Sequence, residues 1–276
     1  MTADARPAPA WLPPHDLHNH TVHCGHAADD ATVPNLVARA GALGLAWFGF
    51  AEHVVFAEDA PRVARVRADL EALPQDGSGP RVLVGMEIDP DPLHLDGRWV
   101  AEPEGADFAV LSPHRIPEYG VGHWQFRDLA LSAAETERLG GLWLDWYAAC
   151  VERAEVDILG HPLREPITLG LLSLREDRTL ERARGILATA ARRGAAFELN
   201  NGWALGLERL GQYEPYVALV RDLRAEGMRF SRGSDSHGVI GVGAADGIAR
   251  LARAAGIEPG DWLAAARLPG ARGAPQ

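Results

Sequence analysis

Seven short apolar segments alternate with longer amphipathic segments along most of this 276-residue chain. The short segments have the length and composition of buried strands, and most of the segments between them show helical periodicity. Strand followed by helix, repeated in this way, is the pattern of a parallel α/β architecture. The predicted strands are His15–His20, Ala46–His53, Arg81–Ile88, Asp107–His114, Val156–His161, Ala195–Asn200 and Arg229–Asp235.

The predicted helices have ordinary start and stop residues, such as Pro34 in a first turn and Gly44 after a last turn. Pro90–Gly105 and Pro113–Arg127 are predicted to be long loops, of the kind that often line sites. A closed barrel and an open doubly wound sheet both fit the alternation. The Gly-Xaa-Gly-Xaa-Xaa-Gly fingerprint that would favour the open sheet does not follow the first strand. The helices are predicted at Pro34–Leu43, Arg62–Leu73, Ala133–Arg153, Arg178–Arg193, Tyr213–Glu226 and Ala244–Ala255.

We expect one domain at residues 15–267, with a flexible leader at 1–14 and a flexible tail at 268–276. No apolar stretch is long enough to span a membrane, and the leader lacks the features of a signal peptide. Two cysteines are too few for a disulfide framework, so we expect a cytoplasmic protein. The net charge of −11 argues against binding to long nucleic acids or anionic membranes. The sequence does not indicate an oligomeric state.

Histidines and carboxylates occur at or just past the ends of the predicted strands, which is where α/β barrels build their sites. Imidazole and carboxylate suit zinc, manganese or iron, and nine such donors exceed the needs of one tetrahedral ion. They favour two or three ions that share a bridging carboxylate. Cys24, between His20 and His26, is interpreted as a small buried residue, with a ligand role as the alternative. The nine donors are His18, His20, His26, His53, Glu87, His114, His161, Asp235 and His237.

The segment Asp16-Leu17-His18-Asn19-His20-Thr21, continuing to Cys24-Gly25-His26-Ala27, resembles the first motif of the PHP (polymerase and histidinol phosphatase) family. Its Cys-Gly-His-Ala ending is similar to that of the histidinol-phosphatase branch. The resemblance departs from the family at Glu52, where Asp is usual, and at Ile88-Asp89, where an apolar or aromatic continuation is expected. Further matches, in family order, are Ala51-Glu52-His53, Gly85-Met86-Glu87, Ser112-Pro113-His114, Gly160-His161-Pro162, Glu198-Leu199-Asn200 and Gly233-Ser234-Asp235-Ser236-His237.

This resemblance implies a distorted (β/α)7 TIM-like barrel, the PHP fold, with three divalent metal ions (zinc, manganese or iron) at its C-terminal rim. By the family pattern, one ion is held by His18, His20, Glu87 and Asp235. A second is held by Glu87, His114 and His161, and the third by His26, His53 and His237. Glu87, Asp235 and His237 then take part in catalysis. The implied reaction is hydrolysis of a phosphate monoester by a metal-bridging hydroxide.

The expected partner is a small phosphorylated metabolite, and histidinol phosphate is the first candidate. Arg164 and Arg115 follow two of the predicted ligands, and a guanidinium complements a pair of anionic oxygens, so both are predicted to bind substrate. Asn201 is predicted to shape the same pocket. The alternatives are a nucleotide phosphatase or phosphodiesterase that uses the same metals, and a non-catalytic metal-binding relative of such an enzyme.

Overall fold

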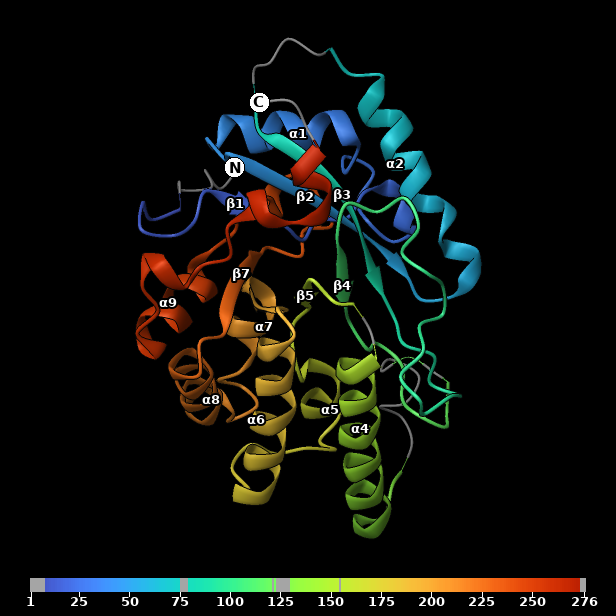
Figure 1. Ribbon diagram of the computed structural model, residues 1–276, viewed down its shortest axis with the longest axis vertical. Coiled ribbons are helices and arrows are strands. Elements are labelled where there is room, and N and C mark those ends of the chain that lie inside the picture. The colour runs from blue at the N-terminus through green and yellow to red at the C-terminus, as the bar shows by residue number, and fades with distance from the viewer. Residues whose placement is uncertain (1–7, 75–78, 121, 123–129, 154, 274–276) are drawn as a thin grey trace.

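The computed structural model describes residues 8–74, 79–120, 122, 130–153 and 155–273, and its seven parallel strands pair in chain order (Figure 1). Every neighbouring pair of strands is parallel, so each connection crosses back over the outside of the sheet. The strands are β1 (His15–Asp16), β2 (Trp47–Val54), β3 (Arg81–Ile88), β4 (Ala109–Leu111), β5 (Ile158–Leu159), β6 (Ala196–Asn200) and β7 (Arg229–Gly233).

Helices follow six of the seven strands and pack on the outside of the sheet, whereas the described residues 89–108, between β3 and β4, contain no helix (Figure 1). The prediction gave the bounds of β3 and α4 correctly, but it missed two short helices, α5 and α7, that begin directly after predicted site segments. Of the predicted loop Pro113–Arg127, residue 121 and residues 123–127 lie outside the described residues. The helices are α1 (Val33–Ala42), α2 (Pro61–Glu71), α4 (Ala133–Arg153), α5 (Arg164–Thr168), α6 (Asp177–Arg192), α7 (Asn201–Gly206), α8 (Tyr213–Ala225) and α9 (Asp246–Ala255).

Three backbone hydrogen bonds join the segment after β1 to β7 and the residues that follow it. Leu17 N donates to Arg232 O over 3.0 Å, and Asp235 N donates to His18 O over 2.8 Å. His20 N donates to Ser236 O over 2.9 Å, and Asn19 and Ser236 form a parallel bridge. First and last strands are therefore linked, which makes the sheet a barrel and rules out the open doubly wound alternative.

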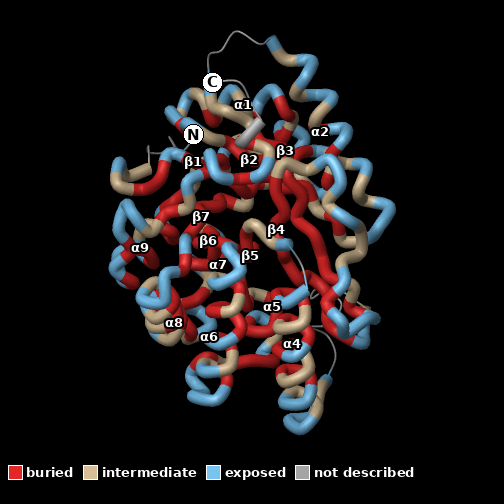
Figure 2. Tube along the Cα trace, viewed as in Figure 1, coloured by how far each residue is buried: buried red, intermediate tan, exposed pale blue. Residues whose placement is uncertain are grey.

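Side chains on β2 and β3 alternate between the two faces of the barrel wall. Phe48 and Phe50 point outward and are fully buried in an apolar cluster with α1 and α2. Most of the tube along β2 and β3 is accordingly coloured as buried (Figure 2). Gly49 points inward, where a Cβ would lie 2.9 Å from Leu17 Cα. Continuing the same alternation, His53 and Glu87 also point inward. On β2, the inward residues near the middle of the strand are small, and the polar His53 lies at the C-terminal end.

The opposite end of the barrel is closed by apolar side chains. Inward residues near the strand starts pack with Leu268 and Ala271 from the end of the chain. Leu12, before β1, is also buried, and Pro14 O accepts hydrogen bonds from the backbone of Ala46 and Trp47. The described parts of the expected leader and tail are thus packed against the domain, because they cover apolar surface that the barrel leaves open.

The longest helix, α4, buries one face against its neighbours. Trp143, Trp146, Tyr147 and Cys150 are spaced by three or four residues, so they share one side of the helix, and each is at most 1% exposed. They belong to the largest apolar cluster, which lies between the barrel wall and the outer helices. None of the helices in the described ranges is long and apolar enough to cross a membrane.

Replacing Trp146 with Ala should therefore lower the free energy of unfolding by about 3–5 kcal/mol, because the deletion leaves a cavity in this cluster. Urea unfolding followed by circular dichroism measures the change. The control is Glu152→Ala at the exposed C-terminal end of the same helix, which should change stability by less than about 0.5 kcal/mol. Equal midpoints for the two variants would contradict the packing described for α4.

Candidate metal centre

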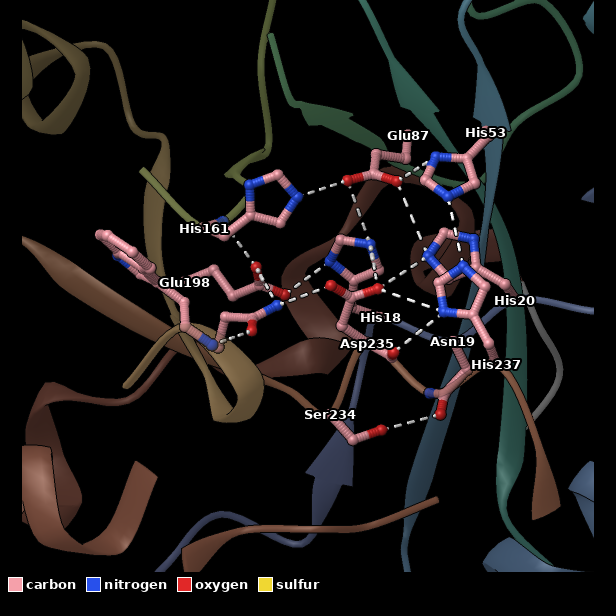
Figure 3. Close-up of polar contacts among 12 residues, drawn as sticks. His18, Asn19, His20, His53, Glu87, His161, Glu198, Ser234, Asp235 and His237 are labelled. Atoms are coloured by element: carbon pink, nitrogen blue, oxygen red, sulfur yellow. Dashed lines mark hydrogen bonds and ion pairs between the residues drawn. The ribbon is translucent and has the colours of Figure 1, made fainter. Parts of the chain in front are cut away.

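The nine predicted donors lie on the C-terminal side of the barrel, and eight of them converge on its mouth around Glu87, with His26 at the exposed edge. Figure 3 shows seven of the converging donors: His18, His20, His53, Glu87, His161, Asp235 and His237. His53 and Glu87 are direct neighbours in the register of β2 and β3. His18 and His20 follow β1, which is shorter than predicted, and the hydrogen bonds to the β7 segment hold them beside Asp235. The predicted strand ends therefore gave the correct location of the site, although four of the strands, β1, β4, β5 and β7, end earlier than predicted.

Glu87 is the centre of this group and is fully buried. Its Oε1 lies 2.9 Å from His161 Nε2, and its Oε2 lies 2.7 Å from His53 Nδ1. One carboxylate that contacts so many imidazoles on both of its oxygens has the position of a bridging ligand. In all, the Glu87 oxygens lie within 3.6 Å of a nitrogen of five histidines: His18, His20, His53, His114 and His161.

The side of the centre nearer to solvent contains Asp235 and His237. Asp235 Oδ1 lies 3.1 Å from His20 Nε2 and 3.7 Å from His237 Nδ1. His53 Nε2 and His237 Nε2 are 3.4 Å apart. Ligand atoms that lie within 4.8 Å of one another form four groups: His20, His53 and His237; Cys24, His26 and His237; His18, His20 and Asp235; and His53, Glu87 and His114.

Several of these donor atoms are buried and make no hydrogen bond with any described residue. They are His18 Nε2, His20 Nδ1, His53 Nδ1, His114 Nε2 and Glu87 Oε2. A buried polar atom without a partner costs free energy, so such atoms are rare unless something else binds them. His18 Nε2, His53 Nδ1 and His114 Nε2 each lie within 3.4 Å of a Glu87 oxygen without the geometry of a hydrogen bond. The donor set therefore fits divalent metal ions that prefer nitrogen and oxygen.

Glu198 is a site residue that the list of predicted ligands missed, although the Glu-Leu-Asn motif had been noticed. Its side chain is 1% exposed; Oε1 lies 2.7 Å from His18 Nδ1, and Oε2 accepts a hydrogen bond from His161 N over 2.7 Å. Asn200 Nδ2 donates to Glu198 Oε2 and to Asp235 Oδ2 (Figure 3). Glu198 thus orients His18 so that its Nε2 faces Glu87, as outer carboxylates do for metal-binding histidines.

Asp89 has the same role for His114. Its Oδ1 lies 2.7 Å from His114 Nδ1, and its Oδ2 accepts a hydrogen bond from Arg115 Nε over 3.2 Å. Asp89 was noted in the sequence only as a departure from the family pattern. It is fully buried and holds a predicted ligand and a predicted substrate-binding residue together.

The second departure, Glu52, points away from the ligands because it alternates with His53 on β2. Its Oε1 accepts a hydrogen bond from Thr21 N over 2.7 Å, which fixes the start of the loop that carries Cys24 and His26. Burial raises the pKa of Glu52. The carboxylate therefore positions the loop that follows His20 and is not a ligand itself.

Electrostatic interactions favour the charged forms of Glu87, His18 and His114, whereas burial lowers the pKa of His20, His26 and His237. Burial works against the charge on Glu87, but His18, His53 and His114 outweigh it and hold the pKa of Glu87 well below its ordinary value. Burial likewise lowers the pKa of His18, but Glu198 and Glu87 outweigh it, so this pKa is raised well above 6.5. The pKa of His114 is raised too, since Glu87 and Asp89 outweigh its burial.

Beside the ligands lies a cavity of about 490 Å³, whose lining includes His53, His237 and Asp235. Arg115 and Arg164 both line it, as predicted, and Arg62 lines it without having been predicted. Asn201 is not part of this lining: its Oδ1 accepts a hydrogen bond from Gly247 N and so ties α7 to α9. The structure brings the two arginines to the pocket but does not bring Asn201 there.

Removing the carboxylate of Glu198 should weaken metal binding. Glu198→Gln replaces one of the two carboxylate oxygens that accept hydrogen bonds from His18 Nδ1 and His161 N with an amide NH₂ group. Zinc affinity should therefore fall by about 10- to 100-fold. Competition with a chromophoric chelator measures this affinity. Glu208→Gln, at an exposed ion pair with Arg250, is the matched control. Equal zinc affinity in the two variants would show that Glu198 does not support the ligands.

Zinc binding to chelator-treated protein should release protons near neutral pH. His18 and His114 have raised pKa values, so each carries a proton that zinc must displace. Zinc affinity should therefore increase as the pH rises from 6 to 9. Calorimetric titration in buffers with different heats of ionisation measures the protons released. An affinity and a proton release that stay constant over this range would contradict the assignment.

The structure was compared with known proteins. No family model matches the sequence, and no curated protein matches it. The crystal structure of a histidinol phosphate phosphatase from Lactococcus lactis, in complex with zinc, L-histidinol and phosphate, matches with a TM-score of 0.60. The match is 20% identical and covers 88% of this chain and 93% of that one. This chain therefore has the fold of that histidinol phosphate phosphatase, a seven-stranded β/α barrel. An uncharacterized protein matches with 12% identity and a TM-score of 0.40, covering 87% of this chain and 69% of that one.

Proposed function

We propose that this protein is a metal-dependent phosphatase that hydrolyses the phosphate monoester of a small metabolite. The observation that carries the proposal is the convergence of five histidines on the two oxygens of buried Glu87. The shared fold with a zinc-containing histidinol phosphate phosphatase supports the same reaction class. Histidinol phosphate is accordingly the first substrate to test.

Three divalent ions, of zinc, manganese or iron, would be held by the nine donors, with Glu87 as the bridge. His53 belongs to two of the four close donor groups, and His237 also belongs to two. Each of these residues would therefore lie between two neighbouring metal ions. Divalent ions bound in this way make water more acidic and withdraw negative charge from a phosphoryl group. Asp235 and His237 lie on the solvent side of the donors, where the ester enters.

The residues around the donors would bind and orient the ester. Arg164 lines the cavity, and its Nη1 lies 3.8 Å from Asp235 Oδ2. It is about one-third exposed, so its remaining N–H groups can turn toward a phosphate oxygen. A cavity of about 490 Å³ suits a small metabolite. A compact pocket of this size also favours a monoester over a polynucleotide strand.

Replacing His20 or Asp235 with Ala should reduce phosphate release by on the order of 10³-fold. Each change removes a donor next to Glu87, and metal ions contribute several kcal/mol to the stabilisation of such transition states. The assay measures phosphate released from histidinol phosphate and a panel of other monoesters, after reconstitution with zinc, manganese or iron.

The matched control is His94→Ala, which removes an exposed histidine that pairs with Asp91 outside the metal centre, and which should keep full activity. A diester, bis(p-nitrophenyl) phosphate, tests the phosphodiesterase alternative and should be cleaved more slowly than the monoesters. Unchanged turnover in the His20 and Asp235 variants, or no release from any monoester by metal-loaded protein, would refute the proposal.

A further inference from the structure

One wall of the cavity is formed by an arginine stacked on an aromatic ring. Arg115 Cζ lies 4.8 Å from the centroid of the Phe56 ring, and both residues line the cavity next to His114. Phe56 is 48% exposed, whereas Arg115 is only 7% exposed. A guanidinium held flat on an aromatic face keeps its orientation and presents the edge that carries its N–H groups.

The hydrogen bonds of Arg115 are incomplete. Its Nε donates to Asp89 Oδ2 over 3.2 Å, and this carboxylate is fixed in turn by His114. Its Nη2 is buried and has no hydrogen-bond partner among the described residues. A buried charged donor without an acceptor is costly, and an acceptor supplied by a ligand would recover that free energy.

Arg115 is directed to a different part of the cavity from the metal donors. His114 and Arg115 are consecutive, and the His114 imidazole reaches to within 3.4 Å of Glu87 Oε1. The Arg115 guanidinium lies instead over Phe56, which follows β2 and stands at the exposed edge. A phosphate at the metal centre would thus leave Arg115 beside the organic part of the ester.

The carboxylates of the cavity lining are already engaged. Asp59 forms an ion pair of 2.8 Å with Arg62 and accepts hydrogen bonds from the backbone N–H groups of Val55 and Phe56. Asp235 contacts His20 and belongs to the donor set. The described lining residues include three arginines and only these two carboxylates. Among the described residues, the wall next to Phe56 therefore has no acid available to bind a cationic leaving group.

From these contacts, and resting on the phosphatase function proposed above, we propose that the substrate carries a second anionic group on its organic part. This group, a carboxylate or a second phosphate, is bound by Arg115 above the Phe56 ring. Asp89 is a positioning residue, because it holds the Arg115 guanidinium at Nε and leaves the terminal nitrogens for the ligand. Esters with a cationic organic part, including histidinol phosphate, are then poorer substrates than anionic ones.

The test compares pairs of monoesters that differ by one anionic group. The carboxylate pair is 3-phosphoglycerate and glycerol 3-phosphate, and the phosphate pair is fructose 1,6-bisphosphate and fructose 6-phosphate. Phosphoethanolamine and histidinol phosphate represent cationic esters. Metal-loaded wild-type protein should show a kcat/KM at least about tenfold higher for the anionic member of one pair, because a charge-assisted hydrogen bond is gained. Which pair shows the preference identifies the second anion.

Arg115→Gln should bring that ratio close to one, and Arg115→Lys should retain part of the preference. Arg184→Gln, an exposed arginine on α6, is the matched control and should leave the ratio unchanged. Thermal unfolding checks that the variants fold. Inhibition of p-nitrophenyl phosphate hydrolysis provides a binding measurement: glycerate should inhibit wild type more strongly than glycerol, and Arg115→Gln should lose this difference.

The outcomes separate the two proposals. Phosphate release without preference in either pair, or a preference that survives in Arg115→Gln, overturns the inference about Arg115 and leaves the phosphatase function intact. A preference for the cationic esters overturns it as well. No release from any compound overturns the phosphatase function and this inference with it.

Discussion

The whole site depends on the backbone hydrogen bonds that close the barrel between its first and last strands. These bonds join residues more than 200 positions apart, and they place His18 and His20 beside Asp235. A shift of this pairing by one residue would turn alternate side chains to the other face and remove two predicted ligands from the centre. Asp235 adopts a left-handed conformation, with φ of 56°, at the point where the chain leaves β7. Such strain persists only where the surroundings enforce it, and closure of the barrel provides that constraint.

Around the donors, buried carboxylates fix the imidazoles. Glu198 holds His18 and the backbone of His161, and Asp89 holds His114. Space for Glu198 depends on Gly233: a Cβ there would overlap Glu198 Oε1 and would lie 2.7 Å from His18 Cβ. The aliphatic and aromatic clusters on both sides of the barrel wall keep these groups dry, so their interactions are strong. The same rigidity extends through Asp89 to Arg115, so the metal centre and the wall of the cavity form one connected unit.

Much of this arrangement was predictable because its signals are local. The short apolar run gave the bounds of β3, helical periodicity gave α4, and donors at strand ends gave the location of the site. The ends of β1, β4, β5 and β7 were predicted too late, because residues typical of strands continue after the backbone has left the hydrogen-bonded sheet. Glu198 and Asp89 were missed as site residues because a carboxylate that orients a histidine looks, in sequence, like any other buried acid. Asn201 was placed in the pocket because it follows β6, but its side chain caps the neighbouring helix α9.

By itself, the sequence determined the number of β/α units, the apolar and polar faces of each unit, and the residue types that meet at the strand ends. These follow from period, length and the chemistry of individual side chains, which the order of residues specifies directly. The alternation of strands and helices left the sheet either open or closed, and the family resemblance implied the closed barrel that the structure has. Only the tertiary structure decided that Glu87 stands among five imidazoles and that Arg115 lies over Phe56 instead of among the donors. Each of these features depends on contacts between segments that are distant in the chain. Such contacts are selected by the packing of the whole barrel, and no local pattern encodes them.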